Sequence, residues 1–242
     1  MARNVATNRE PRLGRPGPAP DKHPPVPMDV AVAGGHGKIA LRLLRLLAER
    51  GDRGRGLIRN LEHAADLEEA GATPVGADLE NLDPDAIARS IAGVEAIVFA
   101  AGAGPGSGPA RKRTVDYGGA VKLVEAAKMN GISRYLMVSA MGVRDPAARG
   151  EEMSPYYEAK LEADQELAAS GLDYTIVRPG RLTNDPGTGR IEAAERLERG
   201  GEVPRDDVAA TLLACLDDDG TIGKSFDLVG GETPIAEALA SL

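Results

Sequence analysis

From Met28 to the end of the chain, short apolar segments alternate with longer segments whose apolar residues recur at helical spacing. This alternation restricts the fold more than any other feature of the sequence. The apolar segments are continuous, a pattern typical of strands covered on both faces of a parallel sheet. Repeated strand–helix units with right-handed crossovers therefore predict an α/β fold, a doubly wound parallel sheet with helices on both faces.

The predicted elements follow one another without an internal repeat. Strands are predicted at residues 28–34, 54–59, 72–78, 95–102, 133–142 and 172–180. Helices are predicted at residues 37–50, 61–71, 83–93, 113–129 and 154–169. Two of these helices have recognisable starts, because Asp83 precedes Pro84 and Ser154 precedes Pro155, each an expected N-cap with proline at the first position.

The chain divides into a tail and one domain. Residues 1–27 hold seven of the 17 prolines, are rich in arginine and have almost no large apolar residues, so we expect a disordered tail. Residues 28–242 form the single predicted domain, in which residues 181–242, with a helix near 205–216 and a strand at 224–230, contribute the substrate side. Because the first strand begins at Met28, translation could start at Met1 or at Met28.

Composition excludes several classes of partner. The net charge is −8, and the tail carries five basic and two acidic groups, so the domain alone carries −11. A body this acidic repels phosphate backbones, and two Phe with no Trp leave few platforms for base stacking. We therefore expect no nucleic-acid partner.

The sequence also bears on location. No apolar run approaches the ~20 residues of a membrane span. The single cysteine, Cys215, lies in an apolar run, which suits a core position and a reducing, cytoplasmic location.

A glycine-rich turn follows the first strand and predicts a dinucleotide site. The sequence "GGHGKIA" places glycines at 34 and 37 and a small residue at 40, which allow a tight turn, a close approach to a diphosphate and helix–sheet packing. Backbone N–H groups at the start of the next helix would face that diphosphate. The cofactor-binding residues expected in this turn are Gly34, Gly35, His36, Gly37, Lys38 and Ile39.

His36 is expected to act mainly through its backbone. No other His or Cys is spaced along the sequence to join it as a metal ligand or as a base. We therefore expect no metal site, and we expect Lys38 to be solvated near phosphate.

The end of the second strand bears on the choice of cofactor. An acidic residue there normally accepts hydrogen bonds from a ribose hydroxyl, but this chain has Arg59 followed by Asn60. A guanidinium pairs with a 2′-phosphate, which favours NADP, with NAD as the alternative. Ligands bind at the carboxyl ends of strands, so further contacts are expected from residues after strands three and four. These are Asp78, Leu79, Ala100, Ala101 and Gly102.

Tyr156 and Lys160 form a candidate catalytic pair at the start of the helix after strand five. Their spacing of four places both side chains on one helix face. An ammonium beside a phenol favours the phenolate and is expected to lower the pKa of the tyrosine, which then exchanges a proton with a carbonyl or alcohol. Ser139 closes strand five at the same edge, where its hydroxyl could orient the carbonyl oxygen.

These segments resemble the short-chain dehydrogenase/reductases, most closely their compact atypical branch with NAD(P)-binding, epimerase-like and nitrogen-repressor-like members. The resemblance rests on "VAGGHGKIA", "LIRN", "GADL", "VFAAGAG", "VSAMG", "YYEAK" and "YTIVRPGRLTNDPGTG", and it spans residues 28–242. It implies a Rossmann-like fold, Tyr156 as acid/base, Lys160 as the holder of the nicotinamide ribose and Ser139 as the catalytic serine. It also places Pro179 and Gly180 near the nicotinamide ring.

Two departures from that pattern leave the function open. Asp116 stands where the family often has Asn, and Ala140 replaces the second of two serines. The favoured hypothesis is an NADP-dependent oxidoreductase acting on a small carbonyl or alcohol. The alternatives are a non-catalytic NAD(P)H sensor and, less favoured, a sugar-nucleotide epimerase or dehydratase. The expected partner is a small-molecule substrate, and the protein could be a monomer or a homodimer.

Overall fold

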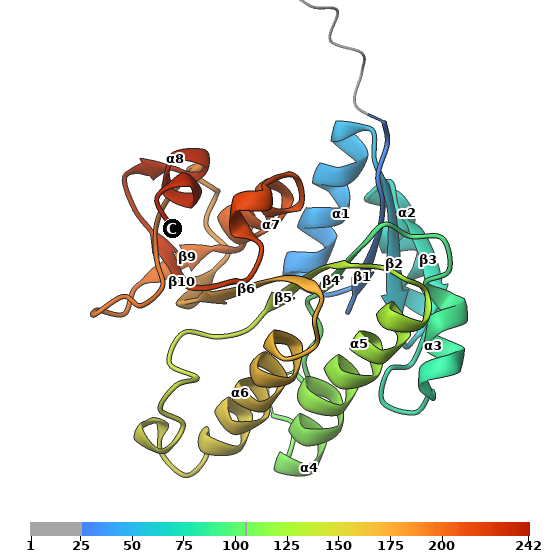
Figure 1. The fold of residues 1–242 in the computed structure, drawn as a ribbon, viewed down its shortest axis with the longest axis horizontal. Coiled ribbons are helices and arrows are strands. Elements are labelled where there is room, and N and C mark those ends of the chain that lie inside the picture. Colours follow the sequence, from blue (N-terminus) through green and yellow to red (C-terminus); the bar gives the residue numbers. More distant parts are fainter. Residues whose placement is uncertain (1–25, 105) are drawn as a thin grey trace, which may run out of the picture.

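The computed structural model describes residues 26–104 and 106–242, and it shows the predicted α/β architecture (Figure 1). Nine strands form the main sheet in the order β11-β8-β10-β6-β5-β4-β1-β2-β3, and neighbouring strands from β3 through to β10 are parallel. The strands are β1 Asp29–Ala33, β2 Arg53–Ile58, β3 Thr73–Gly76, β4 Ala96–Phe99, β5 Arg134–Val138, β6 Asp173–Pro179, β8 Arg190–Ala194, β10 Lys224–Gly230 and β11 Thr233–Pro234. Two short strands, β7 Arg181–Thr183 and β9 Glu202–Pro204, pair separately.

Helices cover both faces of the sheet. They are α1 Lys38–Arg50, α2 Ala64–Glu69, α3 Pro84–Ser90, α4 Pro109–Arg111, α5 Ala120–Met129, α6 Ser154–Ala168, α7 Arg205–Asp217 and α8 Ile235–Ala240. A π-helical segment, η2 Lys112–Gly119, joins α4 to α5, and three 3₁₀ turns occur at η1 Leu61–His63, η3 Ala147–Arg149 and η4 Asp219–Thr221. The predicted Rossmann-like fold class is confirmed.

Alternation along β1 divides the core into two layers. Val30 and Val32 pack with residues of α1, α2, α7 and α8, whereas Ala31 and Ala33 pack with residues of α3, α5 and α6. All four residues are fully buried, because a strand in the middle of a doubly covered sheet directs successive side chains into opposite apolar layers. The continuous apolar pattern of the sequence follows from this arrangement.

The sheet order creates the site. β1 lies between β2 and β4, and the chain proceeds from β1 outward to β2 and β3 before returning to β4 on the other side. At such a reversal the loops after the two central strands diverge and leave a crevice at the carboxyl edge of the sheet. The loops after β1, β2, β4 and β5 therefore position the candidate site.

Two local predictions were wrong. The helix expected at 113–129 begins earlier, at Pro109, and passes through the wider π-helical turns of η2, a departure that is frequent at functional sites. Ser154 is not the N-cap of α6, because the helix begins at Ser154 itself, with Met153 as the cap. The Ser154 hydroxyl donates instead to Glu158, 2.7 Å away. The predicted cap at Asp83 is confirmed, since its carboxylate accepts from the Ala86 N–H at 2.7 Å.

Other predictions concern the interior and the tail. Cys215 is fully buried in the core, and burial raises the pKa of its thiol to about 12, which confirms the packing role. Across the described part of the chain, no helix has the length and apolarity that crossing a bilayer requires. Residues 1–25 of the predicted tail lie outside the described residues.

Candidate cofactor and active site

The turn after β1 is shaped by close backbone contacts. Gly34 has φ +73, and a Cβ there would lie 2.7 Å from the Cα of Ala101. The N–H of Gly35 donates to the carbonyl of Leu57 at 2.9 Å, and the N–H of Gly37 donates to that of Gly34 at 2.7 Å. The turn is thereby held against β2 on one side and against the segment after β4 on the other.

The first N–H groups of α1 fit a dinucleotide diphosphate. α1 begins at Lys38, immediately after this turn, and the first N–H groups of a helix have no partner inside the helix. The N–H of Gly37 is used within the turn, so the available donors are those of His36, Lys38 and Ile39. The glycine cradle and these donors suit the phosphates of a dinucleotide cofactor.

The segment after β4 lies beside that turn. The N–H of Ala100 donates to the carbonyl of Ala33 at 3.1 Å, so the strand pairing continues past Phe99. A Cβ on Gly102 would lie 3.0 Å from Oδ1 of Asp116. Ala101 therefore lies against Gly34, Ala100 continues the pairing with β1, and Gly102 lies against Asp116.

The end of β2 offers one exposed cation. Arg59 is exposed, and its Nη1 lies 3.9 Å from a carboxylate oxygen of Glu80, a weak ion pair between surface groups. Asn60 is engaged locally, because its side chain accepts from the Glu62 N–H at 3.0 Å and donates to the Glu62 carboxylate at 2.9 Å. Arg59 is thus available to an anionic ligand, and the side chain of Asn60 caps the η1 turn.

The two residues predicted after β3 have structural contacts of their own. The Asp78 carboxylate accepts from the Glu80 N–H at 3.0 Å and from the Asn81 side chain at 2.8 Å. Leu79 is 7% exposed and packs in the core near Phe99. Both residues lie at the carboxyl edge, where Asp78 shapes the turn and Leu79 anchors it.

Lys160 lies at the carboxyl ends of two adjacent strands. Its Nζ donates to the carbonyl of Val138 at 3.1 Å and to that of Ala101 at 3.4 Å. The same Nζ lies 3.4 Å from Oδ1 of Asp116, and both side chains of this ion pair are buried. The ammonium therefore has two backbone carbonyls as hydrogen-bond acceptors and one carboxylate as its ion-pair partner.

Tyr156 lies one helical turn before Lys160 and is half-buried. The pKa of its phenol is raised, because burial disfavours the phenolate more than the charge of Lys160 favours it. Asp116 also raises this pKa by offsetting the lysine. The expected lowering of the pKa is therefore wrong for this structure, and the reason is the combination of burial and a buried carboxylate that sequence spacing did not reveal.

Ser139 is buried beside a second charged pair. Asp164, one turn past Lys160 on α6, accepts from the guanidinium of Arg178 at 2.9 Å. Burial raises the pKa of Asp164, and the charge of Arg178 lowers it in part. Among the described residues, the Ser139 hydroxyl has no partner in hydrogen-bond geometry. Ser139 and Lys160 are thus brought to the end of β5, but Ser139 faces a buried carboxylate.

The residues after β6 are shaped by packing. Pro179 is buried at the end of the strand, and a Cβ on Gly180 would lie 2.3 Å from the carbonyl oxygen of Gly201. Beyond them, the buried Asp207 accepts from the N–H groups of Thr188 and Gly189 at 2.9 Å and 2.8 Å. The segment 184–189 is thereby fixed to the start of α7.

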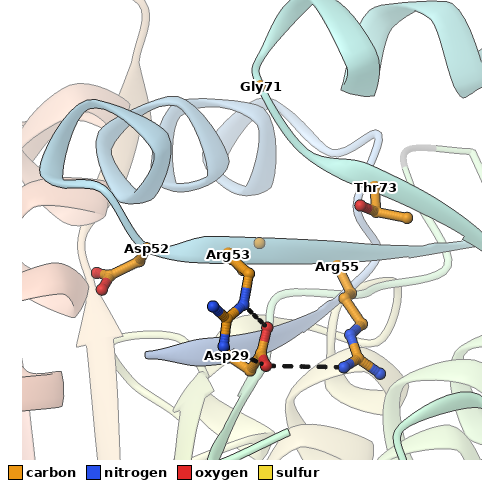
Figure 2. A pocket seen from close by; sticks show the side chains of 7 residues that line it. Asp29, Asp52, Arg53, Arg55, Gly71 and Thr73 are labelled. Carbon is orange, nitrogen blue, oxygen red and sulfur yellow. Dashed lines mark hydrogen bonds and ion pairs between the residues drawn. The ribbon is translucent and has the colours of Figure 1, made fainter. Parts of the chain in front are cut away.

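A cavity lies at the opposite, amino edge of the sheet (Figure 2). Asp29 at the start of β1 accepts two hydrogen bonds of 2.9 Å from Arg53, and Arg55 lies 3.8 Å away. The hydrogen bonds from Arg53 hold the pKa of Asp29 below its ordinary value. This cluster is remote from the glycine turn, because parallel strands separate the two edges.

Sequence reasoning missed the side chains that the fold brings to the predicted residues. His63 stacks on His36, and Asp66 contacts His36, although they are 27 and 30 positions away along the chain. Asp164 could have been found, because it continues the four-residue spacing from Tyr156 and Lys160 along one helix face.

Comparison with known proteins identifies the family. A family described as NAD(P)H-binding matches residues 34–219. A protein of Bacillus subtilis (strain 168), named as the uncharacterized sugar epimerase YhfK, is 47% identical over 216 residues, which cover 89% of this chain and 100% of YhfK.

Two solved structures agree with this assignment. One from Bacillus halodurans, provisionally named an NAD-dependent epimerase/dehydratase, shares 39% identity and a TM-score of 0.84 over 89% of this chain and 100% of its own. The oxidoreductase ylbE of Lactococcus lactis shares 29% identity and a TM-score of 0.77 over 89% of this chain and 96% of its own. The match supports a nicotinamide dinucleotide as cofactor. The chain therefore belongs to the NAD(P)H-binding family, and its similar relatives include proteins named as epimerases.

Proposed function

We propose that this protein is an NADP-dependent oxidoreductase that acts on a small carbonyl or alcohol substrate. One observation carries the proposal: Tyr156 lies a single helical turn before Lys160, whose ammonium is held at the carboxyl ends of β4 and β5. The glycine turn after β1 lies at the same carboxyl edge of the sheet. A cofactor bound at this turn would therefore lie beside Tyr156 and Lys160.

The proposed step transfers a hydride and a proton. Bound NADPH would supply the hydride to the carbonyl carbon. Tyr156 donates the phenolic proton to the carbonyl oxygen, which yields the alcohol and leaves a phenolate that the Lys160 charge stabilises. Ser139, at the end of β5, is the third proposed member of the site. In the reverse direction Tyr156 accepts the proton of the alcohol.

The choice of NADP rests on Arg59. Its guanidinium is exposed at the end of β2 and is bound only weakly to Glu80. A planar cation there pairs with a 2′-phosphate, whereas it cannot accept a hydrogen bond from a 2′-hydroxyl. NAD remains the alternative cofactor.

Calorimetric titration with NADPH and with NADH tests the cofactor. Loss of a charged hydrogen bond typically costs about 1.5–3 kcal/mol. Arg59→Ala should therefore weaken NADPH binding by roughly 10- to 100-fold and leave NADH binding unchanged. Arg89→Ala, which removes an exposed arginine from α3, is the matched control. Equal loss of both nucleotides in Arg59→Ala would contradict a 2′-phosphate contact.

Turnover is tested with NADPH and a panel of small aldehydes and ketones. Removing a general acid typically lowers the rate by about 10²–10⁴-fold. We expect this loss in Tyr156→Phe and little loss in Tyr157→Phe, which changes the adjacent tyrosine. NADPH affinity should survive in both variants. A Tyr156→Phe variant as active as the wild type would exclude this tyrosine as the acid.

A non-catalytic NAD(P)H sensor is the second candidate. Two observations favour it: the Lys160 ammonium already contacts two carbonyls and a carboxylate of the protein, and the pKa of Tyr156 is raised. A sensor would bind NADPH and NADP⁺ with different affinities and turn over none of the panel. Equal affinities for NADPH and NADP⁺, together with no turnover of the panel, would contradict both the sensor and the reductase hypotheses.

Epimerase chemistry is the third candidate, and the name of the Bacillus subtilis relative motivates it. An epimerase takes a hydride from its substrate and returns it to the resulting ketone, so it would change a nucleotide sugar without net oxidation of the cofactor. Incubation with nucleotide sugars, followed by chromatography, tests it against the reductase. The segment 181–242 is proposed to form the substrate side in either case.

A further inference from the structure

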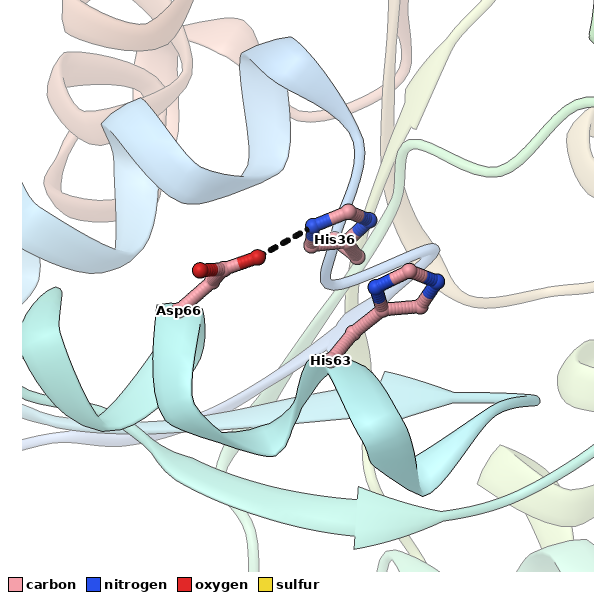
Figure 3. Close-up of side chains that lie close together, drawn as sticks. All are labelled: His36, His63 and Asp66. Atoms are coloured by element: carbon pink, nitrogen blue, oxygen red, sulfur yellow. Dashed lines mark hydrogen bonds and ion pairs between the residues drawn. The ribbon is translucent and has the colours of Figure 1, made fainter.

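Two histidines and an aspartate meet beside the glycine turn (Figure 3). His36 comes from the turn after β1, His63 from η1 and Asp66 from α2. Nε2 of His36 lies 2.6 Å from Oδ2 of Asp66. The imidazole rings of His36 and His63 stack with centroids 3.8 Å apart and planes 11° apart. One potential ligand atom from each residue lies within 4.8 Å of the other two.

The backbone holds each of these groups in place. His36 lies between Gly35 and Gly37, whose N–H groups are both bonded to the backbone. The N–H of His63 donates to the carbonyl of Asn60, which also caps the η1 turn. The three side chains therefore come from backbone segments that are held in place, and side-chain rotation alone is needed to direct them to one ion.

The donor set has a definite chemical preference. Two imidazole nitrogens and one carboxylate oxygen suit zinc and neighbouring first-row divalent ions, whereas magnesium and calcium prefer oxygen alone. Three protein ligands leave one position of a tetrahedral ion for water. The side chains of His36 and Asp66 are 38% and 53% exposed, so an ion reaches them from solvent.

We propose that His36, His63 and Asp66 form a binding site for a divalent ion of the zinc class. Neighbouring ligands of a tetrahedral ion stand roughly 3.3 Å apart, so the short His36–Asp66 contact opens and His63 turns inward by side-chain rotation. The ion then lies between Nε2 of His36 and the carboxylate of Asp66. It thereby links the glycine turn to η1 and α2. This proposal does not rest on the proposed function.

Binding of Co²⁺ and of Zn²⁺ to the full-length protein tests the site. We expect one Co²⁺ per chain with visible ligand-field absorption, and displacement by Zn²⁺. His63→Ala and Asp66→Asn should each weaken binding by about an order of magnitude or more. Zn²⁺ should also raise the thermal unfolding midpoint of the wild type but not that of His63→Ala.

Matched controls separate this site from adventitious binding. His23→Ala removes the remaining histidine of the chain, and Glu69→Gln removes an exposed carboxylate at the end of α2. Neither should alter binding. Circular dichroism of each variant checks the fold, and His63→Gln replaces His63→Ala if the latter unfolds. No stoichiometric binding to the wild type, loss of binding in His23→Ala, or full binding in both cluster variants would overturn the proposal.

Discussion

Lys160 and Asp116 form an ion pair that is almost completely removed from solvent. Nζ of Lys160 lies 3.4 Å from Oδ1 of Asp116, and the two side chains are 4% and 1% exposed. The other carboxylate oxygen accepts from the Ala103 N–H at 3.0 Å. This ion pair therefore holds Lys160 against the segment after β4. The charges of both residues act on the pKa of Tyr156.

Asp116→Asn should lower the pKa of Tyr156, because the removed carboxylate raises it. It should also destabilise the fold by about 3 kcal/mol, since a buried ammonium loses its counter-ion. The ultraviolet titration of Asp116→Asn, minus that of Asp116→Asn/Tyr156→Phe, isolates the titration of Tyr156. It is compared with the same difference between the wild type and Tyr156→Phe. Asp145→Asn, at an exposed aspartate, is the control. If the two difference curves have the same midpoint, Asp116 does not act on the phenol.

Gly34→Ala should cost much more stability than Gly51→Ala. Both glycines have positive φ, +73 and +92, and an alanine in this region costs about 1–2 kcal/mol. Only at Gly34 does the added Cβ also approach Ala101 to 2.7 Å, while at Gly51 it meets nothing within 4 Å. Urea unfolding of both variants measures the difference. Equal losses of unfolding free energy in the two variants would show that the turn relaxes around the added Cβ of Gly34→Ala.

The stability contribution of Asp29 should depend on pH. Its folded pKa is below the ordinary 3.8, mainly through the hydrogen bond from Arg53. Such a group stabilises the fold above its ordinary pKa, and the contribution is lost as the pH falls through the folded pKa. Asp29→Asn should therefore have a lower thermal unfolding midpoint than the wild type at about pH 7, and the two midpoints should agree in strong acid. Because Arg53 is exposed, added salt should shrink the difference, and a gap that persists in strong acid would refute this account.

Cys215 should react with a thiol reagent only after unfolding. It is fully buried, and burial raises the pKa of its thiol to about 12, so the reactive thiolate is scarce in the native protein. Labelling with a disulfide reagent at about pH 8 should be slow in buffer and complete in denaturant. Ser241→Cys, at an exposed position, supplies a fast-reacting control. Rapid native labelling at Cys215 would indicate local opening around α7.

Local pattern predicts the fold and the turn because both depend on short-range chemistry. Continuous apolar strands imply a doubly covered sheet, and Gly34, Gly35 and Gly37 imply a tight turn against neighbouring backbone. The predicted start of α6 at residue 154 is confirmed, but the capping role of Ser154 is not, since its hydroxyl donates to Glu158. Such choices depend on competing partners only one helical turn away.

The sheet, the glycine turn and the spacing of Tyr156 and Lys160 could be predicted from local sequence. The surroundings of these groups became known only from the folded chain. It buried Asp116 beside Lys160, which helps to raise the pKa of Tyr156, and it brought His63 and Asp66 to His36. The physical reason is that burial and charge act through space, and the residues concerned lie tens of positions apart along the chain.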